Sequence, residues 1–166
     1  LAHDNKAALL SSLQQSNYGS EHWQTLAKKL AKKNGEIAYL LADFFMHKKV
    51  SDNTPSSQSK DAILWYQQAI RLNYSKANIA LAELYFRQGD VFAAQELLAE
   101  FQVMSLSPFQ QNDVTLAAII LLTKISISLG DVELMSSLLV KFSSLLQSDK
   151  MGASLLSDIE KYQIMS

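Results

Sequence analysis

The chain has 166 residues, of which 48% are hydrophobic and 19% charged, so it can bury a core and is not a disordered tail. Only 5 Gly and 2 Pro supply too few turns for an all-β fold, whereas the abundant Leu, Ala, Gln and Lys favour helices. The net charge of −1 gives no overall attraction to nucleic acid or anionic lipid, and the absence of Cys excludes disulfides, thiolate metal sites and a cysteine nucleophile.

Apolar residues recur at spacings of three and four along nearly the whole chain, which is the period of a helix buried on one face. The first part of this pattern predicts helices over 4–15 with Asp4 as N-cap, over 20–33 with Ser20 as N-cap, and over 36–46. Asn34-Gly35 is expected to end the second helix with a residue that tolerates positive φ. The polar, Pro-containing segment 48–58 lacks the period and is predicted to be a loop.

The remainder of the chain predicts six more helices, at 59–72 with Ser59 as N-cap, 75–88, 91–102, 112–129, 132–147 and 152–164. About nine helices with short joints and no strands favour an all-α fold, an α-solenoid of antiparallel helix pairs rather than a four-helix bundle. We therefore expect a single helical-repeat domain over 1–166, with repeats at roughly 20–72, 75–106 and 112–147 and a capping helix over 150–164.

Internal similarity supports the repeat interpretation. Residues 41–45 match residues 81–85 in kind at an offset of 40, and residues 88–91 and 97–101 return as 129–132 and 138–142 at an offset of 41. Offsets of this size are typical of stacked helix pairs, because one pair cannot bury its own apolar face and needs its neighbours to do so.

The segment 77–94 resembles a tetratricopeptide repeat. It carries the pair Leu81-Ala82, then Tyr85, then Gly89 at the end of the first helix and the small Ala94 in the second. In such repeats small residues let two helices cross closely, while Leu and Tyr fill the gap between them.

The segment 59–70 resembles the second helix of a Sel1-like repeat, in which an Ala is followed by Trp-Tyr and another Ala, as in Ala62, Trp65-Tyr66 and Ala69. The loop 48–58 stands where that family has an insertion. The two resemblances together imply a superhelix of the tetratricopeptide or Sel1-like kind. They also imply that the aromatic residues at the apolar repeat positions are core: Trp65, Tyr66, Tyr85 and Phe101.

The resemblance further implies that the first helix of each pair lines a concave groove that binds a protein or peptide segment. The inward-facing residues are then Glu36, Tyr39, Asp43, Met46, Lys76, Ile79, Glu83, Phe86 and Arg87, with Lys124, Ile120 and Ile127 from the third repeat. An aromatic side chain followed by a guanidinium, as in Phe86-Arg87, is typical of an interface hot spot. The alternative is that Phe86 is buried against the next pair and Arg87 is only solvated.

The sequence predicts no catalytic, metal or cofactor site. His3, His22 and His47 do not fall three or four apart, as two ligands on one helix face would, and neither a nucleophile motif nor a Gly-rich phosphate loop occurs. The apolar run 114–122 is far shorter than the ~20 residues of a membrane span.

One local basic run, Lys28-Lys29 and Lys32-Lys33, lies on an otherwise apolar-periodic segment. We interpret it as the solvated face of a helix, with phosphate or membrane contact as the alternative. Because aromatic residues are not interleaved with Lys and Arg along the sequence, we expect no nucleic-acid partner.

These features together predict a non-enzymatic scaffold or adaptor. Proteins similar to Sel1-like repeats are often bacterial and lie in the periplasm or at the outer membrane, some of them in the secretion of polysaccharides such as alginate. The resemblance therefore implies an envelope setting, with a cytoplasmic one as the alternative. Two other classes stay open: a non-catalytic appendage of a cell-wall lytic enzyme, and a structural module that forms a homo-oligomer through the third repeat and the tail 151–166.

Overall fold

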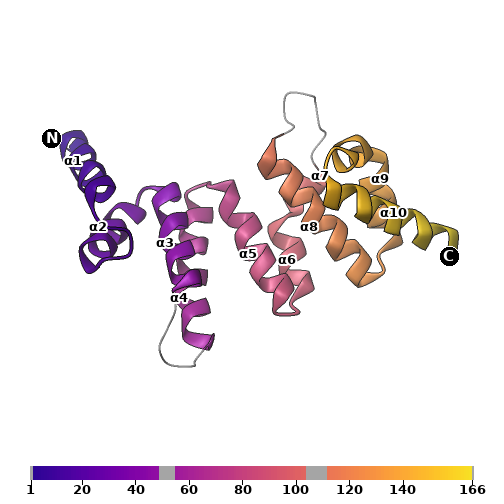
Figure 1. Cartoon of the computed structure of the whole chain (residues 1–166), viewed down its shortest axis with the longest axis horizontal. Helices are drawn as coiled ribbons and strands as arrows, with labels where there is room; N and C mark the ends of the chain where they lie inside the picture. Colours follow the sequence, from indigo (N-terminus) through magenta and orange to yellow (C-terminus); the bar gives the residue numbers. More distant parts are fainter. Residues whose placement is uncertain (1, 49–54, 104–111, 166) are drawn as a thin grey trace. The chain divides into compact units, whose positions relative to one another are not determined.

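The computed structural model describes residues 2–48, 55–103 and 112–165, and within these ranges the chain is helical and contains no strand (Figure 1). This confirms the all-α prediction. The helices are α1 (Ala2–Gln15), α2 (Glu21–Ala31), α3 (Gly35–His47), α4 (Pro55–Arg71), α5 (Ser75–Arg87), α6 (Val91–Leu97), α7 (Ala99–Val103), α8 (Asp113–Leu129), α9 (Val132–Gln147) and α10 (Lys150–Met165). The described ranges hold ten helices rather than about nine, because Leu98, with φ −105° and ψ 8°, ends α6 inside the predicted helix 91–102.

The chain divides into two compact units, Leu1–Asn78 and Ile79–Ser166, and the division falls inside α5. The first unit holds α1 to α4 and the start of α5, and the second holds the rest of α5 and α6 to α10. Within the units consecutive helices pack as pairs, α1 with α2, α3 with α4, and α8 with α9. The predicted repeat 20–72 therefore belongs to the first unit and the predicted repeat 112–147 to the second.

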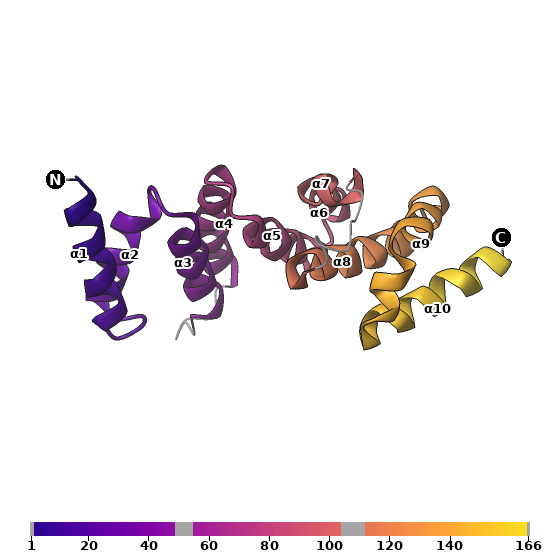
Figure 2. The same cartoon turned by 90° about the horizontal axis from the view of Figure 1, so that it is seen from above.

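The first unit is held together chiefly by α2, α3 and α4. α3 and α4 run side by side in opposite directions (Figures 1 and 2) and contact each other closely. Four alanines on these two helices are completely buried: Ala38, Ala42, Ala62 and Ala69. Small side chains at such positions let two helix backbones approach each other, which explains why the alanines of the apolar pattern recur here.

The turn between α2 and α3 differs from the prediction. Asn34 has φ −125°, not a positive φ, and its side chain accepts a hydrogen bond from the Ile37 N–H at 3.2 Å as the N-cap of α3. Gly35 is the first residue of α3 and its φ is not positive. A Cβ on Gly35 would lie 2.9 Å from the Cβ of Tyr74, so this glycine serves close packing instead of a left-handed turn.

Two predicted N-caps are wrong because their helices begin earlier. α4 begins at Pro55, inside the predicted loop, so Ser59 lies within the helix. Proline suits the first helical position because its missing N–H would have no partner there. α1 begins at Ala2, which places Asp4 in the first turn. The prediction for Ser20 is confirmed: its hydroxyl accepts a hydrogen bond from the N–H three residues further on, at 3.1 Å.

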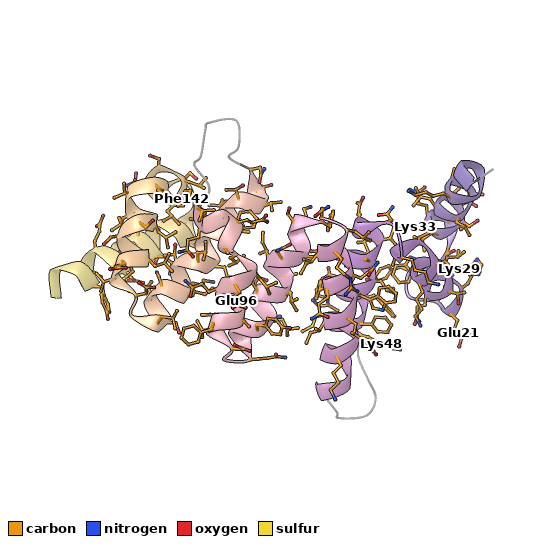
Figure 3. All side chains as sticks on the ribbon, turned by 180° about the vertical axis from the view of Figure 1, so that it is seen from behind. Glu21, Lys29, Lys33, Lys48, Glu96 and Phe142 are labelled. Atoms are coloured by element: carbon orange, nitrogen blue, oxygen red, sulfur yellow. The ribbon has the colours of Figure 1, made fainter. Side chains whose placement is uncertain are left out.

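The second unit packs around α8, which contacts α6, α7, α9 and α10. Phe142 of α9, labelled in Figure 3, is one of the largest completely buried side chains of this core. Three hydroxyls are also buried in α8, and each has a local partner: Thr115 Oγ1 donates to Oδ1 of the N-cap Asn112 at 3.1 Å, and the other two bond within the helix. Thr123 Oγ1 donates to the Ile119 carbonyl at 2.8 Å, and Ser126 Oγ donates to the Thr123 carbonyl at 2.7 Å. The polar residues therefore do not weaken the core, since only an unpaired buried hydroxyl is costly.

The Gly-Asp pairs that repeat in the sequence form the same joint twice. Gly89 and Gly130 have φ of 87° and 63°, the left-handed region that favours glycine. The N–H groups of Asp90 and Asp131 donate to the carbonyl five residues back, at 2.9 and 3.0 Å, which closes the preceding helix. Their carboxylates accept from the N–H three residues on, at 3.2 and 3.0 Å, which caps the next helix. The offset of 41 is therefore a repeated joint between helices.

Candidate functional site

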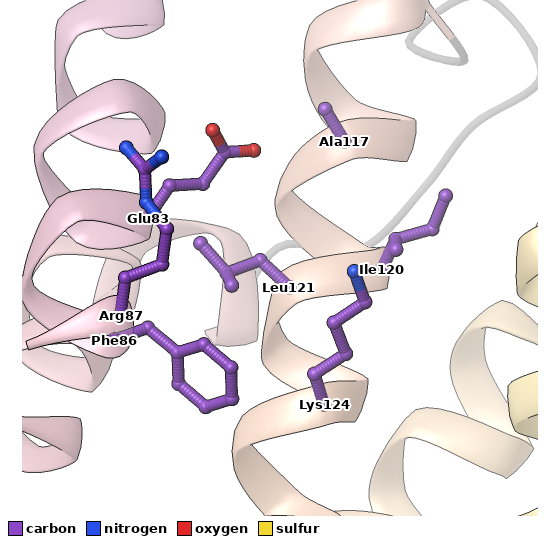
Figure 4. Close-up of a pocket in the computed structure, with 7 residues that line it drawn as sticks. All are labelled: Glu83, Phe86, Arg87, Ala117, Ile120, Leu121 and Lys124. Carbon is purple, nitrogen blue, oxygen red and sulfur yellow. The ribbon is translucent and has the colours of Figure 1, made fainter. Parts of the chain in front are cut away.

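A pocket of about 440 Å³ lies between α5 and α8 in the second unit (Figure 4). The side chains that line it are Glu83, Phe86 and Arg87 from α5 and Ala117, Ile120, Leu121 and Lys124 from α8. In each helix these positions are three or four residues apart, so each set occupies one face. This pocket is the candidate functional site.

The core of the second unit fixes the two walls of the pocket. Ala82 of α5 and Ala118 and Ile119 of α8 are completely buried in that core. The adjoining positions, among them Phe86 and Ile120, pack against the core but remain partly exposed. The apolar lining of the pocket is therefore the outer edge of the core itself, held by rigid helices rather than loops.

Three charged side chains surround this apolar lining. Glu83 and Arg87 are exposed, whereas Lys124 is partly buried on the opposite wall (Figure 4). Within the described part of the chain, none of the three makes a hydrogen bond or an ion pair. Two cations and one carboxylate leave the pocket with one surplus positive charge. It can therefore accept an apolar side chain together with an anionic group.

Four of the ten residues predicted to bind a partner line this pocket: Glu83, Phe86, Arg87 and Lys124. Ile120, expected on the same face, lines it as well. That they bind a partner stays a prediction. Ala117 and Leu121 were not predicted from the sequence. Each lies three residues before an expected residue, Ile120 or Lys124, so one further helical turn on the same face would have included them. Ile127, one turn beyond Lys124, does not line the pocket.

Two other predicted residues of α5 lie elsewhere. Ile79 is only 7% exposed, belongs to the core of the second unit and does not line the pocket. It stands four residues before Glu83, and the register alone did not reveal that neighbouring side chains cover this position. Lys76 is exposed at the start of α5, in the part that belongs to the first unit.

The predicted residues of α3 lie in the first unit, and two of them are engaged in packing. The ring of Tyr39 contacts the rings of Tyr66 and Tyr74, with centroids 5.9 and 5.3 Å apart. Asp43 Oδ1 accepts a 2.7 Å hydrogen bond from the Tyr66 hydroxyl. Glu36 is exposed and Met46 is partly buried. Tyr39 and Asp43 therefore help to hold α4. That residues of this stripe bind a partner stays a prediction.

The aromatic residues predicted to be core are buried to different degrees. Tyr66 and Phe101 are 3% and 4% exposed, which confirms the prediction for both. Trp65 and Tyr85 are partly buried. Among the described residues, no three His, Asp or Glu side chains lie close enough to hold a metal ion.

Comparison with known proteins gives no match: no protein-family model, no curated protein and no solved structure is similar to this chain. In the part of the chain that the structure describes, no helix combines the length and the apolar character needed to cross a membrane. The chemistry of the pocket therefore carries the functional argument.

Proposed function

We propose that this chain is a protein-binding module, a scaffold or adaptor that holds a segment of a partner protein in the pocket between α5 and α8. The observation that carries the proposal is an apolar lining surrounded by three charged side chains, none of which has a partner within the described residues. Aromatic and Arg side chains supply much of the binding energy at protein interfaces, and Phe86-Arg87 places one of each at this pocket.

The charges favour a partner segment that carries both an apolar and an acidic residue. The apolar side chain would enter between Phe86 and Leu121, where it displaces water from partly exposed apolar surface. The acidic residue would lie at Arg87 and Lys124, because a guanidinium binds a carboxylate through two parallel hydrogen bonds. Glu83 would repel a second acidic residue on its side of the pocket, which gives the bound segment a direction.

The resemblance to tetratricopeptide and Sel1-like repeats supports the adaptor proposal and adds a setting, a bacterial envelope or exopolysaccharide secretion complex. The non-catalytic appendage of a cell-wall lytic enzyme and the self-associating module are the competing proposals. A mass in solution that rises with protein concentration would favour the self-associating module. A glycosidase segment in the same gene would favour the appendage.

The test is a selection of random peptides displayed on phage against the whole immobilised chain. We expect enriched peptides to combine an aromatic or aliphatic residue with Asp or Glu a few positions away. Affinities of synthetic versions are then measured with Phe86→Ala and Arg87→Glu. Each should weaken binding by about tenfold or more, as truncation of an interface hot spot does. Phe92→Ala is the matched control, since Phe92 lies in the same unit, is 70% exposed and does not line the pocket.

Charge reversal sharpens this test. A selected peptide with its acidic residue replaced by Lys should bind the parent weakly and the Arg87→Glu variant more strongly. Peptides that bind Phe86→Ala and Phe92→Ala equally well would place the binding surface outside the pocket. A selection that enriches no peptide above background would contradict the proposed function and favour the structural or appendage alternatives.

A further inference from the structure

The formal charge of the chain is divided unequally between the two units. The first unit holds ten Lys and Arg against six Asp and Glu, whereas the second holds five against ten. The net charge of −1 therefore conceals +4 on the first unit and −5 on the second. A compact unit with this surplus of positive charge attracts anions, and it does so most where the lysines gather.

The lysines gather on α2. Lys28 and Lys29 in the last turn of α2, Lys32 at its C-cap and Lys33 in the turn that follows are all exposed and are here called the lysine face. The opposite side of α2 carries its buried residues, from Trp23 to Ala31. Figure 3 labels Lys29 and Lys33 at this end of α2. The side chains of the lysine face therefore project into solvent, supported by a helix whose other side is fixed in the core.

Acidic groups are few around the lysine face. Glu21 is the only acidic residue of α2, and it stands in the first turn, seven residues before Lys28. That separation corresponds to about 10 Å along the helix. Glu36, in the first turn of α3, is the next acidic residue along the chain. Asp43 of α3 lies near Tyr18 and accepts a hydrogen bond from the Tyr66 hydroxyl. These three carboxylates do not outnumber the four ammonium groups.

Folding also places an aromatic ring beside Lys28 of the lysine face and another beside Lys48. The Nζ atom of Lys28 lies 5.9 Å from the centroid of the Phe45 ring, and that of Lys48 lies 5.9 Å from the Phe44 ring. Tyr18 packs edge-on against Phe44, with centroids 5.7 Å apart, and is still 65% exposed. Its ring can therefore receive a further flat group. Tyr18 is connected to Lys28 through the neighbouring rings of Phe44 and Phe45, whose centroids lie 5.4 Å apart. A strand that contacts both the lysines and Tyr18 therefore has to pass over these rings, and single-strand binding surfaces combine cationic groups with aromatic rings in this way.

We propose that the lysine face, together with Tyr18, binds a single-stranded nucleic acid through its phosphates. Lys28 and Lys32 are four residues apart, and because Lys32 keeps the helical conformation as C-cap this is a rise of about 6 Å, which is comparable with the spacing of successive phosphates in an extended strand. Each ammonium acts as a point charge and reads no base edge. Binding is therefore independent of sequence, with one base stacked on Tyr18.

The same observations favour a strand over a membrane surface. A helix that binds a bilayer inserts its apolar face among the lipids, but the apolar face of α2, with Trp23, Leu26 and Leu30, is buried in the first unit. Lysines alone would hold the lipid headgroups without an apolar anchor on this helix. A flexible phosphate chain needs no such anchor and can follow the lysines to the aromatic rings.

The test uses the whole chain and a fluorescent oligothymidine, with affinity measured by anisotropy at increasing salt. Each phosphate contact to a single strand contributes about −0.7 to the slope of log K against log salt, so four contacts predict a slope of about −3. Lys29→Gln/Lys32→Gln/Lys33→Gln should weaken binding at low salt at least about tenfold and reduce the slope to about −1. Tyr18→Ser should weaken binding about fivefold or more through the lost stacking.

The matched control is Lys141→Gln/Lys150→Gln/Lys161→Gln, which removes the same charge from three exposed lysines of the second unit. It should leave affinity and slope nearly unchanged. Equal losses in the two triple variants would overturn the proposal, because net charge alone would then explain binding. Binding to phosphatidylserine vesicles without binding to the oligothymidine would overturn it in favour of a membrane surface. No binding of the oligothymidine at low salt would overturn it outright.

Discussion

The Tyr66 hydroxyl of α4 donates a 2.7 Å hydrogen bond to Asp43 Oδ1 of α3. Tyr66 is 3% exposed and Asp43 is partly buried, so the bond lies at the contact between the two most closely packed helices of the first unit. The ring of Tyr39 contacts the same tyrosine. Residues that the repeat register assigned to partner binding therefore help to join α3 to α4.

Replacing Tyr66 with Phe should destabilise the first unit. A hydrogen bond to a charged group contributes about 1.5–3 kcal/mol, and because Asp43 is only partly buried we expect the free energy of unfolding to fall by about 1 kcal/mol. Urea denaturation measures this change. Asp43→Asn keeps an acceptor oxygen and should lose less. The two substitutions together should cost less than the sum of their separate effects, and strict additivity would show that the bond contributes nothing.

The stability of the first unit should fall at alkaline pH. Burial, and to a smaller extent the charge of Asp43, raises the pKa of Tyr18 above its ordinary value of 10.0. Burial and then Glu36 raise the pKa of Tyr74 in the same way. The folded chain therefore binds these protons more tightly than the unfolded chain. The contribution of these two tyrosines to the free energy of unfolding is fully present below pH 10. It is lost as the pH rises through their raised pKa values.

Two substitutions separate the causes of these shifts. Asp43→Asn should lower the pKa of Tyr18 and leave that of Tyr74 in place, while Glu36→Gln should do the reverse. Titration of the tyrosine ring signals by NMR measures both values in one sample. Equal movement of both pKa values in either variant would contradict the assignment of the two carboxylates.

Two glycines of the second unit should differ in their response to alanine. Gly89 has φ 87° and open space around its Cα, so Gly89→Ala costs only the left-handed conformation, about 1–2 kcal/mol. Gly152 of α10 has an ordinary φ, but a Cβ there would collide with the backbone of Leu146 at the end of α9. Since backbone cannot rotate away, Gly152→Ala should cost about 2 kcal/mol or more despite the better helix propensity of Ala. The two variants are compared by thermal unfolding. A smaller loss of stability for Gly152→Ala than for Gly89→Ala would show that α10 can move away from α9.

The helices could be predicted from the sequence because burial of one helix face repeats apolar residues three and four positions apart, a pattern that is visible within a short segment. The predicted helix 132–147 coincides with α9 at both ends, and the repeated Gly-Asp pairs gave the correct joints, since left-handed glycine and an aspartate cap each depend on a few neighbouring residues. The start of α4 at Pro55 was missed because a polar first turn has no apolar period. The burial of Ile79 was missed because a register does not say where neighbouring helices cover a face.

Part of the pocket and the basic run of the lysine face were within reach of the sequence, whereas the aromatic ring beside Lys28 was not. Glu83, Phe86 and Arg87 share one turn of α5, so a register groups them, whereas their meeting with Lys124 depends on how α8 packs. The expectation of no nucleic-acid partner rested on the net charge and on the order of residues along the chain. Folding removes both grounds, because it separates the charge into two units and brings Lys28 of α2 over Phe45 of α3.

Lys124 offers a test that separates a binding role from a structural one. It is partly buried in the pocket and has no hydrogen-bond or ion-pair partner among the described residues. Lys124→Met keeps an unbranched stem and replaces the ammonium with apolar surface beside Phe86 and Ile120, so it should raise the free energy of unfolding by about 0.5–1 kcal/mol. Lys141→Met, at an exposed lysine of α9, should bring no such gain.

The same Lys124→Met variant should bind the selected acidic peptides about tenfold less tightly, since it lacks the cation that would face their carboxylate. Opposite changes in stability and affinity are what a residue of a binding site would show, because stabilising substitutions at functional positions commonly cost function. If the variant gains stability and keeps its affinity, the acidic residue of the peptide binds at Arg87 and not at Lys124. A variant that loses stability would show that the lysine side chain is needed for packing α8 against its neighbours.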